Sequence, residues 1–123
     1  FDCIILTQTL HYIFDLSAAL ATLRRILKPG GVVLATLPGI SQICRDQLDK
    51  QGDCWRFTAT SARLLFSRHF AGVQVQTYGN VLAAVALLEG LVVEDFKLAE
   101  LNHHDPDYQV TIAVVAVKTA ERR

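Results

Sequence analysis

The first third of the chain combines two continuous apolar runs with a helical pattern between them. Residues 2–7 are a predicted strand whose central residues, 3–6, are apolar without polar alternation, which is typical of a strand covered on both faces. Apolar side chains then recur at helical spacing over residues 16–27, with Asp15 or Ser17 as the N-cap. A Pro-Gly-Gly segment ends this helix, and residues 32–37 repeat the doubly covered strand. The order predicts a right-handed parallel βαβ unit.

The second half of the chain has less regular patterns. Residues 73–78 alternate between apolar and polar side chains, as a strand with one buried face does. Residues 81–91 are apolar on nearly all sides, so we expect that helix to be buried or covered. The other predicted elements are a short helix around residues 43–48, a helix from Thr58 or Thr60 to about residue 69, helical turns at 96–101 and a last, β-branched strand over 109–118.

Composition narrows the class of protein. The 123 residues, 51% of them hydrophobic, are enough for one domain with a real core. The formal net charge is zero, so we expect neither nucleic acid nor an acidic membrane surface as a partner. No apolar run approaches the roughly 20 residues that span a bilayer. The sequence therefore predicts one domain, residues 1–123, that does not bind membranes.

Cysteine and histidine usage indicates the compartment and argues against a metal site. Cys3, Cys44 and Cys54 are odd in number and widely spaced, which favours free thiols in a reducing cytoplasm. The His and Asp residues at 103–107 resemble a ligand cluster. Adjacent His side chains diverge, however, so we interpret this segment as a solvated loop and expect no metal.

Candidate functional residues follow the first predicted strand. Ligands of open α/β sheets bind beyond the carboxyl ends of the strands, which places residues 7–12 at a binding edge. His11 is a candidate general base, because the pKa of an imidazole lies near neutrality. The alternative is that His11 caps the next helix or lines a wall.

Trp55 and Arg56 lie in a loop that is expected over the same edge of the sheet. A Trp side chain stacks on sugar faces or forms a lid, and an Arg side chain holds an anion with paired N–H donors. The alternative is a Trp wedged on the core with the Arg salt-bridged at its rim.

Three segments resemble class I S-adenosylmethionine-dependent methyltransferases. They are FDCIILTQTLHYI, LRRILKPGGVVLATLPG and the closing order of strand, helical insertion and final strand. The resemblance implies an α/β, Rossmann-like, mostly parallel sheet with helices on both faces and an antiparallel last strand. It also implies that the last strand lies between the second and third strands. The cofactor implied is S-adenosylmethionine, lined by Thr7, Gln8, Thr9, Leu10 and His11.

A fourth stretch, DCWRFTATSARLLFSRHF followed by TYGN, resembles a bacterial subgroup linked to sugar and cell-surface polymer modification. That resemblance implies a small-molecule or glycan acceptor, held by Tyr12, Trp55 and Arg56. The chain lacks the glycine-rich first loop of the family and its acidic residue after the second strand, and Cys54 stands where the subgroup has an aromatic residue. We therefore expect residues 1–123 to be the carboxyl-terminal half of a truncated methyltransferase-like domain whose N-terminal strands are absent.

Two functions follow from these patterns. The first is methyl transfer in the parent protein, with His11 as the catalytic base. The alternative is a non-catalytic remnant or interaction module that uses the open sheet edge and the apolar helix 81–91. An unpaired strand over residues 2–7 is prone to pair with another chain, so we expect self-association or a homo-oligomer.

Overall fold

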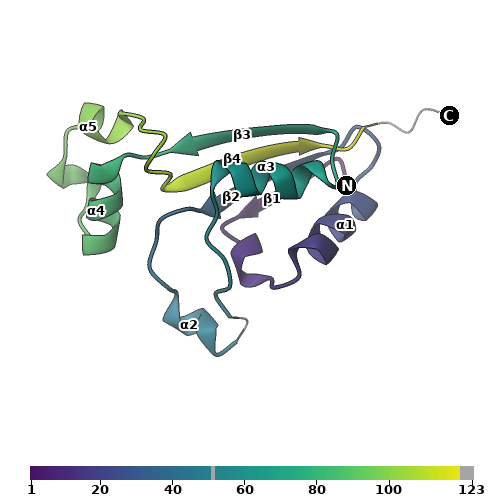
Figure 1. The fold of residues 1–123 in the computed structure, drawn as a ribbon, viewed down its shortest axis with the longest axis horizontal. Helices are drawn as coiled ribbons and strands as arrows, with labels where there is room; N and C mark the ends of the chain where they lie inside the picture. Colours follow the sequence, from purple (N-terminus) through teal and green to yellow (C-terminus); the bar gives the residue numbers. More distant parts are fainter. Residues whose placement is uncertain (51, 120–123) are drawn as a thin grey trace.

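A four-stranded sheet forms the centre of the computed structural model, which describes residues 1–50 and 52–119 (Figure 1). The strands are β1 (Cys3–Thr7), β2 (Val32–Pro38), β3 (Gly72–Tyr78) and β4 (Thr111–Val117), in the order β1-β2-β4-β3. β1 and β2 are parallel, and β4 is antiparallel to both β2 and β3. Three strands therefore point the same way, and the α/β, mostly parallel arrangement with an antiparallel last strand is confirmed.

Two capped helices connect and cover the strands. Helix α1 (Leu16–Ile26) begins at Asp15, whose carboxylate accepts a hydrogen bond from the backbone N–H of Ala18 at 2.9 Å. Helix α3 (Ala59–Ser67) begins at Thr58, whose side chain and that of Ser61 bond reciprocally to each other's backbone N–H groups. Of the alternative N-caps in the sequence, Asp15 and Thr58 are the ones used.

The core lies on one face of the sheet. α1 and α3 both pack there, and Ser17 of α1 hydrogen-bonds His69 just beyond α3 at 3.3 Å. On the opposite face Ile5 is 69% exposed and Leu34 is 37% exposed. The prediction of helices on both faces is thus wrong for the described residues. The prediction rested on the continuous apolar runs of β1 and β2, which place apolar side chains on both faces of the sheet. Helices α1 and α3 cover only one of these faces. The buried core residues are Leu10, Leu20, Leu27, Val33, Ala35, Leu37, Phe57, Ala62, Phe66, Phe70, Ile112, Val114 and Ala116.

The segments that follow the three parallel strands all emerge at the carboxyl edge of the sheet. A 3-10 turn, η1 (Leu10–Tyr12), follows β1, and a loop with the short helix α2 (Arg45–Leu48) follows β2. After β3 come α4 (Val81–Glu89), the turn η2 (Val93–Asp95) and α5 (Leu98–Asn102), at the left of Figure 1. The fold therefore gathers the predicted site residues at one edge.

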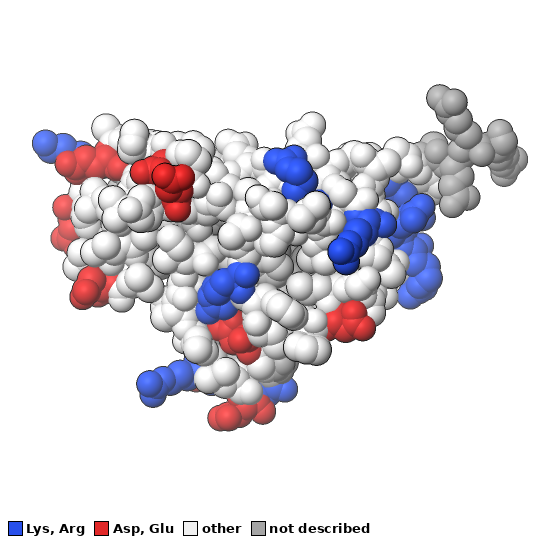
Figure 2. Space-filling view, viewed as in Figure 1, with Lys and Arg blue, Asp and Glu red and all other residues white. Residues whose placement is uncertain are grey.

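The α4–α5 segment projects from the sheet, and the buried amide of Asn80 ties its two ends together. Asn80 caps α4 through the backbone N–H of Ala83 at 2.8 Å and donates to the carbonyl oxygens of Glu100 and His103. Val85 and Leu88 are about half exposed, so the expected cover for the apolar helix is not provided by the described residues. Figure 2 shows acidic side chains around this end and basic ones over α1 and α3.

Candidate functional site at the carboxyl edge

The turn after β1 holds its backbone in a rare conformation. Gln8 has φ of 49°, the left-handed region that non-glycine residues seldom adopt. Its N–H donates to both the carbonyl and the hydroxyl oxygen of Thr36 on β2, at 3.1 and 3.2 Å. The hydroxyl of Thr9 donates to the carbonyl of Thr7 at 3.0 Å. Strained residues held by their surroundings cluster at binding sites, and this one lies where the sequence predicted a cofactor.

Leu10 and His11 turn inward from this edge. Leu10 belongs to the core, so only its backbone is available to a ligand at the edge. His11 is 5% exposed, and its carbonyl accepts a hydrogen bond from the N–H of Cys54 at 2.9 Å. Its ring lies 3.9 Å, centroid to centroid, from that of Tyr12. His11 therefore ties the turn after β1 to the loop after β2.

The ring of His11 carries a buried nitrogen, Nδ1, that has no hydrogen-bond partner among the described residues. Burial lowers the pKa of His11, and the nearby carboxylate of Asp53 only partly offsets this effect. Burial therefore favours the neutral imidazole, which is the protonation state that a general base needs.

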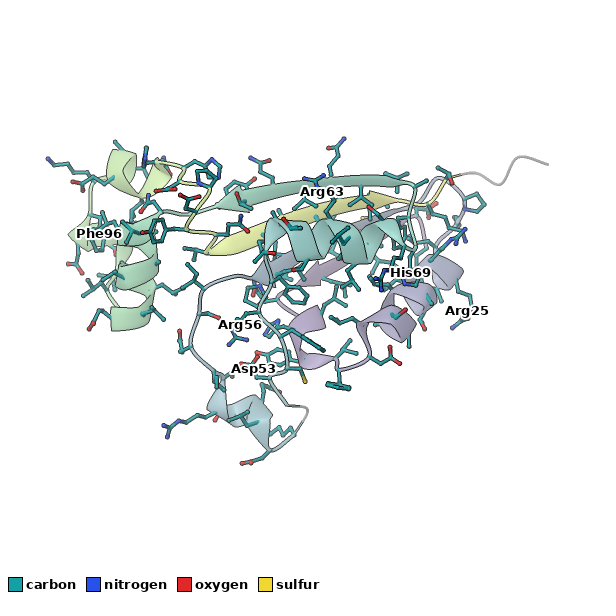
Figure 3. The ribbon with its side chains drawn as sticks, viewed as in Figure 1. Arg25, Asp53, Arg56, Arg63, His69 and Phe96 are labelled. Atoms are coloured by element: carbon teal, nitrogen blue, oxygen red, sulfur yellow. The ribbon has the colours of Figure 1, made fainter. Side chains whose placement is uncertain are left out.

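Arg56 and Asp53 form an ion pair that organises the loop between β2 and α3 (Figure 3). The guanidinium contacts both carboxylate oxygens, at 2.6 and 2.9 Å, and the Asp53 side chain is only 1% exposed. Arg56 also donates to the carbonyl oxygens of Ser41, Gln42 and Trp55. All three guanidinium nitrogens are thus engaged within the loop, and this geometry gives Arg56 a structural role rather than an open anion site.

Electrostatics agree with this assignment. The hydrogen bonds from Arg56, with a further one from the backbone N–H of Cys44, lower the pKa of Asp53 to about 2. The same carboxylate raises the pKa of Arg56. Sequence reasoning missed Asp53, although its position three residues before Arg56 was a usable signal.

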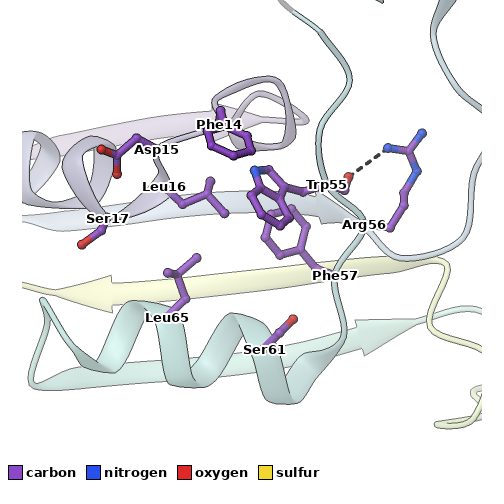
Figure 4. Close-up of a pocket in the computed structure, with 9 residues that line it drawn as sticks. All are labelled: Phe14, Asp15, Leu16, Ser17, Trp55, Arg56, Phe57, Ser61 and Leu65. Carbon is purple, nitrogen blue, oxygen red and sulfur yellow. Dashed lines mark hydrogen bonds between the residues drawn. The ribbon is translucent and has the colours of Figure 1, made fainter.

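Trp55 lies on the other side of the same loop and faces a pocket. Its indole N–H donates to the carbonyl of Ile13 at 3.1 Å, and its ring stacks on Phe14 with centroids 5.7 Å apart. In Figure 4 the Arg56 side chain points away from this pocket, while Trp55 and Phe57 form its centre. Sequence reasoning named Trp55 but not Phe14, an exposed aromatic residue that lies two positions after the end of the η1 turn.

The structure thus divides the predicted site residues into two groups. Thr7 and Gln8 meet Thr36 of β2 at the sheet edge, Thr9 bonds back to Thr7, and the rings of His11 and Tyr12 pack together in the turn that follows. Trp55 and Arg56 diverge, one to the pocket and one to the loop. The His cluster lies apart, where His104 hydrogen-bonds the hydroxyl of Thr77 at 2.9 Å.

Comparison with known proteins identifies the family. The profile of the methyltransferase domain matches residues 1–84, which include the turn after β1, the ion pair and the pocket. The chain belongs to the methyltransferase domain family. A comparison with curated proteins gives no match. Within the described residues, none of the helices of this methyltransferase-family chain is long and apolar enough to cross a bilayer.

Solved structures show where this fold recurs. Phosphoethanolamine N-methyltransferase 2 of Haemonchus contortus, in complex with S-adenosylmethionine, aligns with a TM-score of 0.61 and 17% identity over 97% of this chain. The same enzyme with S-adenosylhomocysteine and phosphomonomethylethanolamine gives 0.59 and 14% over 98%. The CurJ carbon methyltransferase gives 0.57 and 18% over 98%. This chain spans about a third of each of those proteins, namely 33%, 34% and 30% of their lengths.

Proposed function

We propose that this chain supplies the acceptor-side half of an S-adenosylmethionine-dependent methyltransferase domain, with Thr7, Gln8, Thr9, Leu10 and His11 along the cofactor. The observation that carries the proposal is the strained turn at Gln8, which Thr36 fixes at the carboxyl edge of the sheet. The chain that forms this sheet belongs to the methyltransferase domain family. Relatives with the same fold hold S-adenosylmethionine or S-adenosylhomocysteine. Leu10 contributes through its backbone, because its side chain is in the core.

The residues of this chain have modest chemical tasks in such a reaction. A sulfonium donor supplies an already activated methyl group, so the protein mainly has to align the acceptor and exclude water. The strained turn keeps backbone groups at the edge in a fixed direction. His11 is the base in this proposal, and its neutral imidazole has an unpaired Nδ1 that can accept the proton of an acceptor hydroxyl. Because Nδ1 is buried, this role requires the acceptor hydroxyl to gain access past the Tyr12 ring, whose centroid lies 3.9 Å from that of the imidazole.

The acceptor in this proposal is a small molecule or a glycan, held by Tyr12 and Trp55. Arg56 contributes by fixing the backbone of Trp55, to whose carbonyl it donates at 2.9 Å. The three free cysteines support a cytoplasmic location for the protein.

The proposal is tested by titrating S-adenosylhomocysteine into the ¹⁵N-labelled 123-residue chain and following its amide resonances. We expect saturable shifts clustered at residues 7–12 and 36–39. Thr36→Val removes one acceptor of the Gln8 N–H and should weaken these shifts, whereas Thr22→Val on the exposed side of α1 should not. Shifts scattered over the surface, or none at millimolar ligand, would contradict a cofactor site at this turn.

A second function, self-association, is favoured by the open edge of the sheet. Among the described residues β1 pairs only with β2, and its Ile5 side chain is 69% exposed. We propose that the 123-residue chain forms homo-oligomers through β1, since an unpaired apolar edge strand is a template for another strand. Sedimentation should show oligomers that Ile5→Lys disperses and Leu64→Lys, an exposed site on α3, leaves intact. A wild-type chain that is monomeric at high concentration would refute this function.

A further inference from the structure

The pocket beside Trp55 is a built cavity that the proposed cofactor edge does not use. It has a volume of about 690 Å³, within the range of small-molecule sites. It opens between the N-terminal ends of α1 and α3 (Figure 4). Aromatic and aliphatic side chains make most of its wall, namely Phe14, Leu16, Trp55, Phe57 and Leu65.

The aromatic wall is held in place by contacts outside the pocket. The indole N–H of Trp55 is bonded to Ile13, and the backbone of Trp55 is fixed by Arg56, which Asp53 anchors in turn. Phe57 is buried in the core, and its N–H donates to the carbonyl of Pro38 at 2.9 Å. A ligand that stacks on Trp55 and Phe57 therefore meets side chains that are already held in place, which reduces the entropic cost of binding.

The polar side chains at the rim already have partners within the protein. The Ser61 hydroxyl belongs to the cap of α3, and the Ser17 hydroxyl bonds His69. The Asp15 carboxylate caps α1. A glycan would exchange many water hydrogen bonds for few protein ones here, whereas an apolar ring has none to lose.

The charged residues that line the pocket narrow the class of ligand further. Asp15 and Arg56 are the charged residues that line the pocket, and the Arg56 guanidinium is turned away and bonded within its loop. The carboxylate of Asp15 also lines the pocket, at its rim, where it accepts the capping hydrogen bond from Ala18. It disfavours an anion and favours a cation that sits over the ring faces of Phe14 or Trp55.

We propose that this pocket binds a planar aromatic ring, uncharged or cationic, as the recognised part of the methyl acceptor. The choice of an acceptor rests on the proposed function, but the binding of the ring does not require the cofactor. The proposal replaces the glycan alternative with an aromatic class and makes Phe14 and Leu65 binding residues beside Trp55.

The chain offers a direct reporter for the test, because Trp55 is its only tryptophan. The indole N–H resonance of the ¹⁵N-labelled chain is followed while 1-naphthol is added, with methyl β-D-glucopyranoside as the sugar probe. We expect a saturable shift with 1-naphthol and none with the glucoside at equal concentration. Phe14→Ala should weaken binding about two- to tenfold through the lost ring contact. The matched control is Phe1→Ala, at another exposed Phe outside the pocket.

A second pair of variants covers the aliphatic wall. Leu65→Glu places a charge against the bound ring and should abolish the shift, whereas its neighbour Leu64, which is 63% exposed, should tolerate the same change. The charge preference is tested with 1-naphthylmethylammonium and 1-naphthoate. 1-Naphthylmethylammonium should bind about two- to fivefold more tightly than 1-naphthoate. Asp15→Asn, which keeps a capping side chain, should remove that difference.

The outcomes separate this proposal from the proposed function. Equal shifts with glucoside and naphthol, or naphthol binding that Phe14→Ala and Leu65→Glu leave unchanged, would overturn an aromatic site. A chain that binds naphthol at Trp55 but gives no S-adenosylhomocysteine shifts at residues 7–12 would keep the pocket and refute the cofactor turn. The reverse pattern would keep the cofactor turn alone.

Discussion

Replacing Asp53 by Asn removes the charge that anchors Arg56 in the loop between β2 and α3. In the native chain Asp53 accepts two hydrogen bonds from the guanidinium and one from the N–H of Cys44. An amide has only one acceptor oxygen, and its NH₂ group would face the donors of Arg56. The substitution therefore leaves a cation whose side chain is 26% exposed without its counter-charge.

The pKa of Asp53 sets the size of the expected effect. The folded chain lowers this pKa from 3.8 to about 2, which corresponds to about 2 kcal/mol of stabilisation. Because the folded pKa is the lower one, this stabilisation is complete above the unfolded pKa and is lost as the pH falls towards the folded one. Asp53→Asn should thus lower the free energy of unfolding by about 2 kcal/mol at pH 7 and by much less near pH 2.

Urea denaturation of both chains from pH 7 to pH 2, followed by circular dichroism, measures this difference. Other carboxylates titrate in both proteins, so subtracting one curve from the other isolates Asp53. Asp46→Asn, at an exposed carboxylate on α2, is the control and should change stability by less than about 0.5 kcal/mol. A difference between wild type and Asp53→Asn that is the same at pH 7 and pH 2 would refute the electrostatic account of the ion pair.

Three further predictions concern the turn after β1 and the projecting helix. Gln8→Gly should raise the free energy of unfolding by about 0.5 kcal/mol and Gln8→Val should lower it by more than about 1 kcal/mol, because φ is 49° there; urea denaturation that ranks them the other way contradicts the strain. His11→Gln should remove a loss of stability that the wild type shows below about pH 6.5, since burial lowers the folded pKa; equal pH profiles of unfolding would count against it. Asn80→Ala should cost about 2 kcal/mol and speed hydrogen exchange in residues 81–102, while unchanged exchange there would disprove the amide anchor.

Local sequence patterns predicted the helices and strands of this fold, but they did not predict how these elements assemble. The cap at Asp15, the Pro-Gly-Gly stop and the β-branched run near the end predicted their elements to within a few residues. The sheet order came from the family resemblance, because strand pairing between distant segments leaves no short-range pattern. The apolar run of β1 gave Ile5 a hydrophobic side chain, but nothing local states which layer covers it.

The candidate site also combines features that the sequence predicted with features that it did not. Position after a strand was enough to place Thr7, Gln8 and Thr9 at the edge. The role of Arg56 could not be predicted, because the acceptors at Ser41 and Gln42 are backbone carbonyls, which look alike in every sequence. The pocket could not be predicted from the sequence either, because Phe14 and Leu65 lie far apart along the chain and come together only when it folds.

The position of β4 has a consequence for how this chain reaches its folded state. β2 and β3 do not pair with each other, and each pairs with β4, which comes last of the strands in the described residues. During synthesis the sheet therefore remains in two separate parts until the residues up to Val117 have left the ribosome. Pairings that span so much sequence slow the search for the native topology. A ribosome stalled before β4 should carry a nascent chain in which β1 and β2 can pair but β3 cannot join them, which leaves the exposed edge of β2 open to a chaperone or a neighbouring chain.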